Sequence, residues 1–252
     1  IRYSLILAIA SLVALHGFLS SGNRWRRWMP NALAILGVAI HILAVRTGLV
    51  MFYLGFVILL LFYMIKQKRW IILVISLTGM ALVAMLAFEY VPSLKQKMDY
   101  VRYDYMQFEK GQGQTYSDSE RRISIMTGWN LFLENPIMGV GVGDLREEMA
   151  NVYEQTEVIS RKKFPHNQFV FVLAACGIIG ALIFFGGLLY PMFMSHTPNR
   201  LLFIVIYLFI LISMLVENTV ETQVGNAIVI FWICFFLKQE KDQALGKWSS
   251  TS

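Results

Sequence analysis

Runs of apolar residues, each close to the length that crosses a bilayer, are the feature of this 252-residue sequence that most limits its fold. An α-helix rises about 1.5 Å per residue, so about 20 apolar residues cross the roughly 30 Å of hydrocarbon in a membrane. Hydrophobic residues make up 57% of the chain and charged residues 15%, whereas soluble domains are about a quarter charged. The sequence therefore predicts an all-α fold, a polytopic transmembrane helix bundle. The seven predicted spans are 3–19, 31–45, 48–65, 70–90, 167–190, 201–216 and 224–237.

Basic residues in the short segments between these runs set the predicted orientation. By the positive-inside rule, short loops rich in Lys and Arg face the cytoplasm, whereas loops longer than about 60 residues are largely exempt. The topology places the long polar stretch 95–165 outside. The basic short segments, which alternate with turns of almost no charge, are 24–27, 66–69, 196–200 and 238–247.

Four parts of the chain follow from this topology. The stretch 95–165 holds ten of the 22 basic residues and eleven of the 16 acidic ones. Because the chain starts at Ile1 and enters an apolar run at once, we expect a fragment that lacks earlier helices rather than a secretion signal. The predicted parts are 1–94 with four spans, 95–165 as one large external helical loop, 166–237 with three spans, and 238–252 as a cytoplasmic tail.

Charge and cysteine placement argue against several classes of function. The net charge of +6 does not predict nucleic-acid binding, because most basic residues lie in short loops beside spans, where topology signals belong. Cys176 and Cys234 both fall in apolar runs, so no disulfide framework is expected. The sequence has no HExxH motif and no paired cysteines, so neither a metal nor another cofactor is expected.

One helix is predicted inside the long loop, from Asp118 or Ser119 to Glu134. Short polar side chains suit its N-cap, and Pro136 ends it. A mostly apolar side predicts contact with the membrane helices or the interface. That side holds Ile123, Met126, Trp129, Asn130 and Leu133.

Three arginines are candidates for binding an anion. Arg121 and Arg122 lie in the first turn of the loop helix, where positive charge opposes the helix dipole. Guanidinium groups pair bidentately with phosphate oxygens, and N–H groups at a helix start add to the field, so a diphosphate site would use this arrangement. The plainer alternative is a solvated cap paired to Glu120. Arg46 interrupts the apolar run 31–65 and is either part of a polar site or a turn residue that reaches a lipid headgroup.

Gly139, Gly141 and Gly143 form a glycine-rich turn after this helix. Their spacing is neither the dinucleotide GxGxxG nor a P-loop, so a tight turn is favoured over a backbone cradle for an anion. A mobile linker is predicted over 111–115, and a second short helix over 144–153.

His166 and Asn167 lie where the loop re-enters the membrane. A histidine there can act as a general base or orient an acceptor hydroxyl, whereas an interfacial helix cap is the alternative. Glu217 ends a span on the outer side and either positions a sugar, pairs with Arg46 or marks the interface. His16 and His41 lie within apolar runs and are expected to be structural or hydrogen-bonded within the bundle. Candidate contacts to a diphosphate or glycan thus include Gly139, Gly141, Gly143, Asn167 and Glu217.

Taken in order, these motifs resemble the superfamily of O-antigen ligases and O-antigen polymerases, which are bacterial glycan transferases. The resemblance covers roughly residues 40 to 220. No single motif is sufficient, but their order, with a long loop between the arginine and histidine motifs, is fairly specific. The resembling segments are Arg46-Thr-Gly48, Arg121/Arg122, Asn135-Pro-Ile-Met-Gly-Val-Gly-Val-Gly143, His166-Asn-Gln-Phe169 and Cys176-Gly-Ile-Ile-Gly180.

The resemblance implies a metal-independent glycosyl transfer at the outer, periplasmic face of the bacterial inner membrane. The donor would be a glycan on undecaprenyl diphosphate, and the acceptor lipid A-core for a ligase. A second lipid-linked repeat would be the acceptor for a polymerase, and a protein hydroxyl for an oligosaccharyltransferase. Carried over by position, Arg46 and either Arg121 or Arg122 would hold the diphosphate as leaving group. His166 would activate or orient the acceptor hydroxyl.

Three departures from the family pattern stand beside the resemblance. Arg46 follows Val45, where a small hydroxyl residue is frequent, and Ala175 stands where an acidic residue is common. Seven spans are fewer than the ten to twelve of complete members. A lipid-linked glycan transporter is the alternative from another class, although polar residues gather at the outer face rather than at mid-membrane. A non-catalytic membrane partner is the third possibility.

Overall fold

A computed structural model of the chain describes residues 2–20, 26–109, 117–155, 164–194 and 199–249, and every regular element among them is helical. The predicted all-α fold is confirmed. The physical reason is that long apolar runs without internal breaks fold locally into helices. The membrane-type helices are α1 (Arg2–Leu19), α2 (Met29–Leu43), α3 (Arg46–Lys66), α4 (Trp70–Tyr90), α8 (Gln168–Met194), α9 (Arg200–Val216) and α10 (Gln223–Ser249). The other elements are η1 (Arg26–Trp28), α5 (Pro92–Glu109), α6 (Ser117–Glu134) and α7 (Leu145–Gln155).

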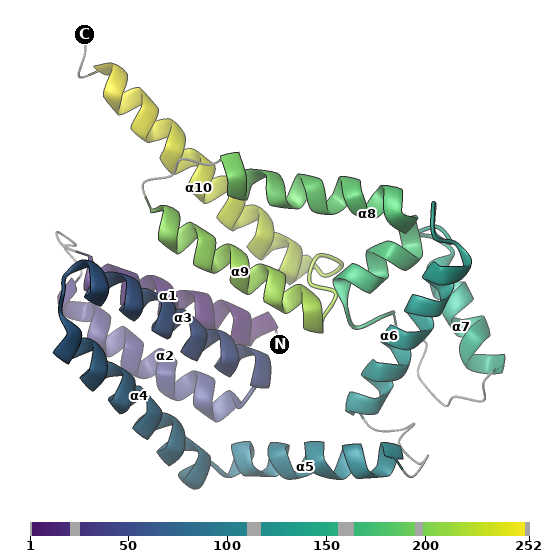
Figure 1. Cartoon of the computed structure of the whole chain (residues 1–252), viewed down its shortest axis with the longest axis horizontal. Helices are drawn as coiled ribbons and strands as arrows, with labels where there is room; N and C mark the ends of the chain where they lie inside the picture. The colour runs from purple at the N-terminus through teal and green to yellow at the C-terminus, as the bar shows by residue number, and fades with distance from the viewer. Residues whose placement is uncertain (1, 21–25, 110–116, 156–163, 195–198, 250–252) are drawn as a thin grey trace. The chain divides into compact units, whose positions relative to one another are not determined.

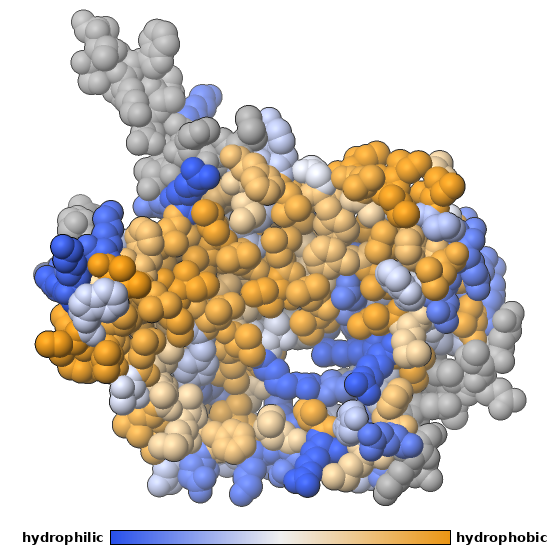
Figure 2. Space-filling model, viewed as in Figure 1, coloured by the Kyte–Doolittle hydropathy of each residue, from blue (hydrophilic) through white to orange (hydrophobic). Residues whose placement is uncertain are grey.

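Three of the described helices are long and apolar enough to cross a membrane: Arg46–Lys66, Trp70–Tyr90 and Gln168–Phe193. Tyr3–Leu19, Arg200–Val216 and Gln223–Lys238 are apolar but shorter. The predicted count of seven spans is therefore not confirmed, although the membrane class of the protein is supported. The surface over the second half of α8 is largely hydrophobic in Figure 2, and Leu182 and Ile183 are 70% and 73% exposed there.

Contacts group the chain into two compact units, and the predicted four-part division stays a prediction. Unit 1 comprises Ile1–Asp99 and Asn199–Ile210. Within it α1 packs against α2 and α3, and α4 packs against α3 (Figure 1). Gly55 of α3 allows this close approach, because a Cβ atom there would lie 2.6 Å from Leu12 Cδ1 and 2.5 Å from Phe209 Cζ.

Unit 2 comprises Tyr100–Pro198 and Leu211–Ser252. Helix α6 packs against α8 and α7 (Figure 1), and the predicted apolar side of α6 is not the side that these contacts bury. Met126, Trp129 and Leu133 are 61%, 44% and 58% exposed. The buried side is the opposite one, because α7 and the first half of α8 pack there. The core of this unit includes Leu131, Phe132, Leu145, Met149, Tyr153, Phe171 and Val172.

Helix α8, which the sequence predicts as one continuous span over 167–190, is broken at Gly177. This residue has φ 63° and ψ −166°, a combination that is accessible essentially only to glycine. The loop after α6 fills the break with backbone hydrogen bonds. Ile178 N–H donates to Pro136 O at 2.9 Å, and Val140 N–H donates to Ala174 O at 2.9 Å.

The long loop contains more regular structure than the sequence predicts. The predicted helices over 118–134 and 144–153 correspond to α6 and α7. The sequence did not predict helix α5, which starts at Pro92 with one residue, Val91, between it and the end of α4. The predicted linker over 111–115 lies outside the described residues.

Candidate functional site

Glu217, directly after α9, bridges two of the predicted site residues in unit 2, Arg121 and His166. Its Oε1 accepts a hydrogen bond from Arg121 Nη2 at 3.2 Å, and its Oε2 lies 3.1 Å from His166 Nδ1. A carboxylate only accepts hydrogen bonds, so Nδ1 of His166 is the protonated nitrogen in this pair. The three side chains are 19–28% exposed, so the cluster is shielded but reachable from outside.

Ser124 ties the backbone of His166 to α6. Its hydroxyl donates to Arg121 O at 2.8 Å and accepts the His166 N–H at 3.3 Å. Ser124 is completely buried. It is a site residue that sequence reasoning missed, because a lone serine within a helix carries no signal of a contact 42 residues away.

Asn167 and Gln168 directly follow His166 and connect the start of α8 to the end of α9 and the turn after it. Asn167 Oδ1 accepts the N–H groups of Phe169 and Val170 at 2.9 and 3.1 Å, and its Nδ2 donates to Leu215 O at 3.1 Å. Asn167 is thus the N-cap of α8, the plainer of the two alternatives drawn from the sequence. Both ends of its amide make hydrogen bonds within the protein, and its contact with a glycan stays a prediction.

Gln168 fixes the turn that carries Glu217. Its side chain is completely buried. Gln168 Oε1 accepts the Val220 N–H at 3.0 Å, and its Nε2 donates to Glu221 at 3.4 Å. The start of α8 and the turn after α9 are therefore held together on both sides of the His166–Glu217 pair.

Arg122 lies apart from this cluster, although it is the neighbour of Arg121 in the first turns of α6. Its guanidinium carbon lies 5.6 Å from the ring centre of Tyr105 and 5.2 Å from that of Phe108, both on α5. These are cation–π distances. The sequence left open which arginine serves the site, and the described contacts favour Arg121.

The glycine-rich turn forms part of an interlock with α8, which is the set of backbone hydrogen bonds between residues 136–141 and residues 174–179. The N–H of Gly139 donates to Asn135 O, and the N–H of Gly141 donates to Ala175 O, each at 2.9 Å. Both amides have backbone partners, which favours the tight-turn alternative, and the contact of Gly139 and Gly141 with a phosphate stays a prediction. Gly143 has no neighbouring atom within 4 Å of a Cβ position and keeps its predicted role only as a hypothesis.

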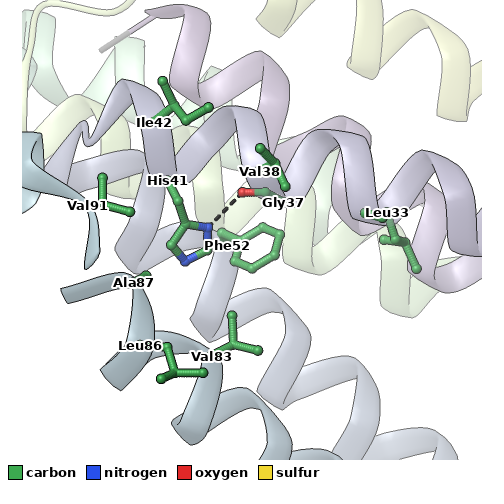
Figure 3. A pocket seen from close by; sticks show the side chains of 11 residues that line it. Leu33, Gly37, Val38, His41, Ile42, Phe52, Val83, Leu86, Ala87 and Val91 are labelled. Atoms are coloured by element: carbon green, nitrogen blue, oxygen red, sulfur yellow. Dashed lines mark hydrogen bonds between the residues drawn. The ribbon is translucent and has the colours of Figure 1, made fainter. Parts of the chain in front are cut away.

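Arg46 begins α3 and belongs to unit 1. The same unit holds a cavity of about 490 Å³ between α2, α3 and α4, and Arg46 is not among the residues that line it. Figure 3 shows His41 at its wall, with Nδ1 donating to Gly37 O at 2.7 Å. Nε2 of His41 accepts from the Tyr53 hydroxyl at 2.6 Å. The other lining residues are apolar, so the cavity suits hydrocarbon and offers no group for transfer chemistry.

Both histidines of the apolar runs are satisfied within the bundle. His41 makes the two bonds just described, and His16 Nδ1 lies 3.0 Å from the Tyr63 hydroxyl. Their predicted structural role is confirmed. Among the described residues, no group of three or more His, Cys, Asp or Glu side chains is arranged to hold a metal ion.

The Arg121–Glu217–His166 cluster combines a cation with an oriented base. A guanidinium has five N–H donors, enough to hold one carboxylate oxygen and an oxygen of a second anion. With Nδ1 of His166 protonated toward Glu217, Nε2 is the nitrogen that can take a proton from a hydroxyl. The cluster can therefore stabilise a departing anion and activate a nucleophile at one place.

Comparison with known families decides the class of the protein. A family model described as O-antigen ligase matches residues 31–185, more than half of the chain. The chain belongs to the O-antigen ligase family. As a member of the O-antigen ligase family it is a bacterial membrane protein of the glycosyl-transfer class, acting on glycans and lipid-linked substrates. No curated protein matches the sequence. Arg46, Arg121 and His166 lie within the matched region, and Glu217 lies beyond it.

Proposed function

We propose that this O-antigen ligase family member transfers a glycan from a polyprenyl diphosphate, such as undecaprenyl diphosphate, to an acceptor hydroxyl without a metal ion. The reaction would take place at the periplasmic face of the inner membrane, with seven spans and the loop 95–165 outside. The favoured acceptor is lipid A-core, which makes the protein an O-antigen ligase. The observation that carries the proposal is the bridge of Glu217 between Arg121 and His166.

In the proposed step, His166 Nε2 takes the proton of the acceptor hydroxyl as its oxygen bonds to the anomeric carbon of the donor sugar. The bond between that carbon and the diphosphate oxygen breaks, and its electron pair leaves with the diphosphate. Arg121 stabilises the negative charge that develops on the leaving group, and a preorganised cation is effective in this role. Arg46 is the proposed second cation, from its position in the sequence.

Glu217 has two functions in this scheme. It keeps Nδ1 of His166 protonated, which leaves Nε2 available as the base, and it stabilises the imidazolium after proton transfer. The same carboxylate holds the Arg121 guanidinium at 3.2 Å, so one residue sets the spacing between the base and the cation.

The surface polysaccharide of cells expressing the protein tests this function. Gel profiles are compared between wild type and His166→Ala at matched protein levels. If lipid A-core loses its glycan while polyprenyl-linked polymer accumulates, the protein is a ligase and His166 is required. If only single repeats remain, it is a polymerase of the same superfamily, whereas lost glycosylation of protein hydroxyls would indicate an oligosaccharyltransferase. An unchanged profile in the variant would exclude His166 as the base.

A further inference from the structure

Asp104 of α5 is a buried acidic side chain with no part in the reaction proposed above. It is 1% exposed. Its Oδ2 accepts the N–H of Asp118 at 2.9 Å, and its Oδ1 accepts the hydroxyl of Ser119. Both partners lie in the first turn of α6, whose N–H groups have no partner within the helix. Asp104 therefore supplies, from another helix, the acceptor that an N-cap residue supplies in most helices.

The charge of Asp104 also has a partner in this turn. A carboxylate is costly to bury unless hydrogen bonds and opposite charge compensate it. The positive end of the α6 dipole provides that compensation. Arg121 and Arg122 put two positive charges where the dipole disfavours them, and the Asp104 carboxylate offsets this effect together with Asp118 and Glu120 of α6.

A second contact holds the same two helices together. Arg122 lies over Tyr105 and Phe108, which follow Asp104 by one and four residues on α5. The chain of α6 is thus held by α5 on both sides of Arg121: at Asp118 and Ser119 before it, and at Arg122 after it.

We propose that Asp104 is a positioning residue for Arg121. By fixing the first turn of α6, it sets the place from which the Arg121 guanidinium reaches both Glu217 and the diphosphate of the donor. This inference rests on the proposed function, in which Arg121 binds the diphosphate. Without the Asp104 carboxylate, the first turn of α6 loses two hydrogen-bond acceptors and an opposing charge, and the position of Arg121 loosens.

Binding of farnesyl diphosphate to the detergent-solubilised full chain tests the proposal, because it measures diphosphate recognition without the transfer step. Asp104→Ala is expected to raise the Kd about tenfold. Asp99→Ala is the matched control, since Asp99 lies on the same helix and is exposed, and its Kd is expected to stay within about twofold of wild type. Ser119→Ala removes only one of the two hydrogen bonds, so an intermediate rise of about threefold is expected even if Asp104→Ala fails to fold.

A double-mutant cycle separates a positioning role from a general structural one. In an Arg121→Ala background, Asp104→Ala should change the Kd by less than about twofold, because the group that it positions is gone. An undiminished tenfold effect in that background would show that Asp104 does not act through Arg121 and would overturn the proposal. Equal Kd values for wild type, Asp104→Ala and Ser119→Ala would also overturn the positioning role of Asp104, but they would not contradict the proposed function. A wild-type chain that does not bind the probe would instead overturn the proposed donor, and the positioning role with it.

Discussion

The interlock between the broken helix α8 and the loop after α6 yields a sharp prediction for Gly177→Ala. Gly177 has φ 63° and ψ −166°, and a residue other than glycine in such a region costs about 1–3 kcal/mol. A Cβ atom there would also lie 2.3 Å from Ile137 O, a distance that real Cβ atoms essentially never show. The loop would have to move away.

That movement puts the hydrogen bonds of the interlock at risk. Ile178 N–H donates to Pro136 O at 2.9 Å and Ile179 N–H to Ile137 O at 3.4 Å, and loss of one such bond costs about 1 kcal/mol. Backbone strain and one lost bond together give about 2–4 kcal/mol of destabilisation. For a chain of this size, each kcal/mol lowers Tm by about 2–4 °C, so we expect Gly177→Ala to melt roughly 5–15 °C below wild type.

Thermal unfolding of the detergent-purified chain measures this shift, and Gly186→Ala is the matched control. Gly186 lies on the same helix and has no atom within 4 Å of a Cβ position. Alanine is favoured over glycine within a helix by up to about 1 kcal/mol, so Tm of the control should stay or rise slightly. A Tm of Gly177→Ala within about 2 °C of the wild-type Tm would correspond to less than about 1 kcal/mol of destabilisation. The break in α8 would then not depend on glycine, and the interlock would be refuted.

Two further predictions concern unit 2. Glu217→Gln should lower the glycan transfer rate roughly tenfold to a hundredfold, because a charge-assisted hydrogen bond contributes about 1.5–3 kcal/mol. Glu221→Gln, in the same turn, is the control, and its rate should stay within a fewfold of the wild-type rate. Equal rates for the two variants would contradict the bridging role. Burial, with smaller opposing and reinforcing contributions from Thr127 and Glu120, raises the pKa of Tyr153 to about 12. A tyrosine in an unfolded chain ionises near pH 10, so the stability that Tyr153 contributes is complete below pH 10 and is lost as the pH rises through about 12. Tyr153→Phe should therefore lose less stability than wild type between pH 9 and about pH 12 in chemical unfolding, and identical pH profiles would count against the buried phenol.

The helices were predictable because their apolar runs encode them locally. The span predicted over 70–90 coincides with α4, Trp70–Tyr90. Helix α5 was not predicted, because its tyrosines and methionines alternate with Lys and Asp and give no apolar run. The break at Gly177 is hidden for the opposite reason, since a glycine within an apolar run also fits an unbroken membrane helix.

For the site, the residue types in the sequence indicated which residues were candidates, but the sequence did not indicate which of them contact one another. Arg121 and His166 stand out in sequence because a charged or titratable group beside a membrane segment needs a reason. Glu217 is 96 residues from Arg121 and 51 from His166, and nothing local in the chain encodes contacts over such separations. The same holds for Ser124, Gln168 and Asp104, each of which makes at least one hydrogen bond to a residue far along the chain.

The proposed mechanism requires that Arg121, rather than Arg122, binds the diphosphate. The decisive measurement is the rate of glycan transfer from a polyprenyl diphosphate donor by the full chain in vesicles, with Arg121→Ala compared with Arg122→Ala. Loss of a group that stabilises the leaving charge should lower the rate about 10²–10³-fold for Arg121→Ala. Loss of two exposed cation–π contacts, about 0.5–1 kcal/mol each, should lower it no more than about thirtyfold for Arg122→Ala. Full transfer by Arg121→Ala, or an equal loss in the two variants, would contradict the assignment.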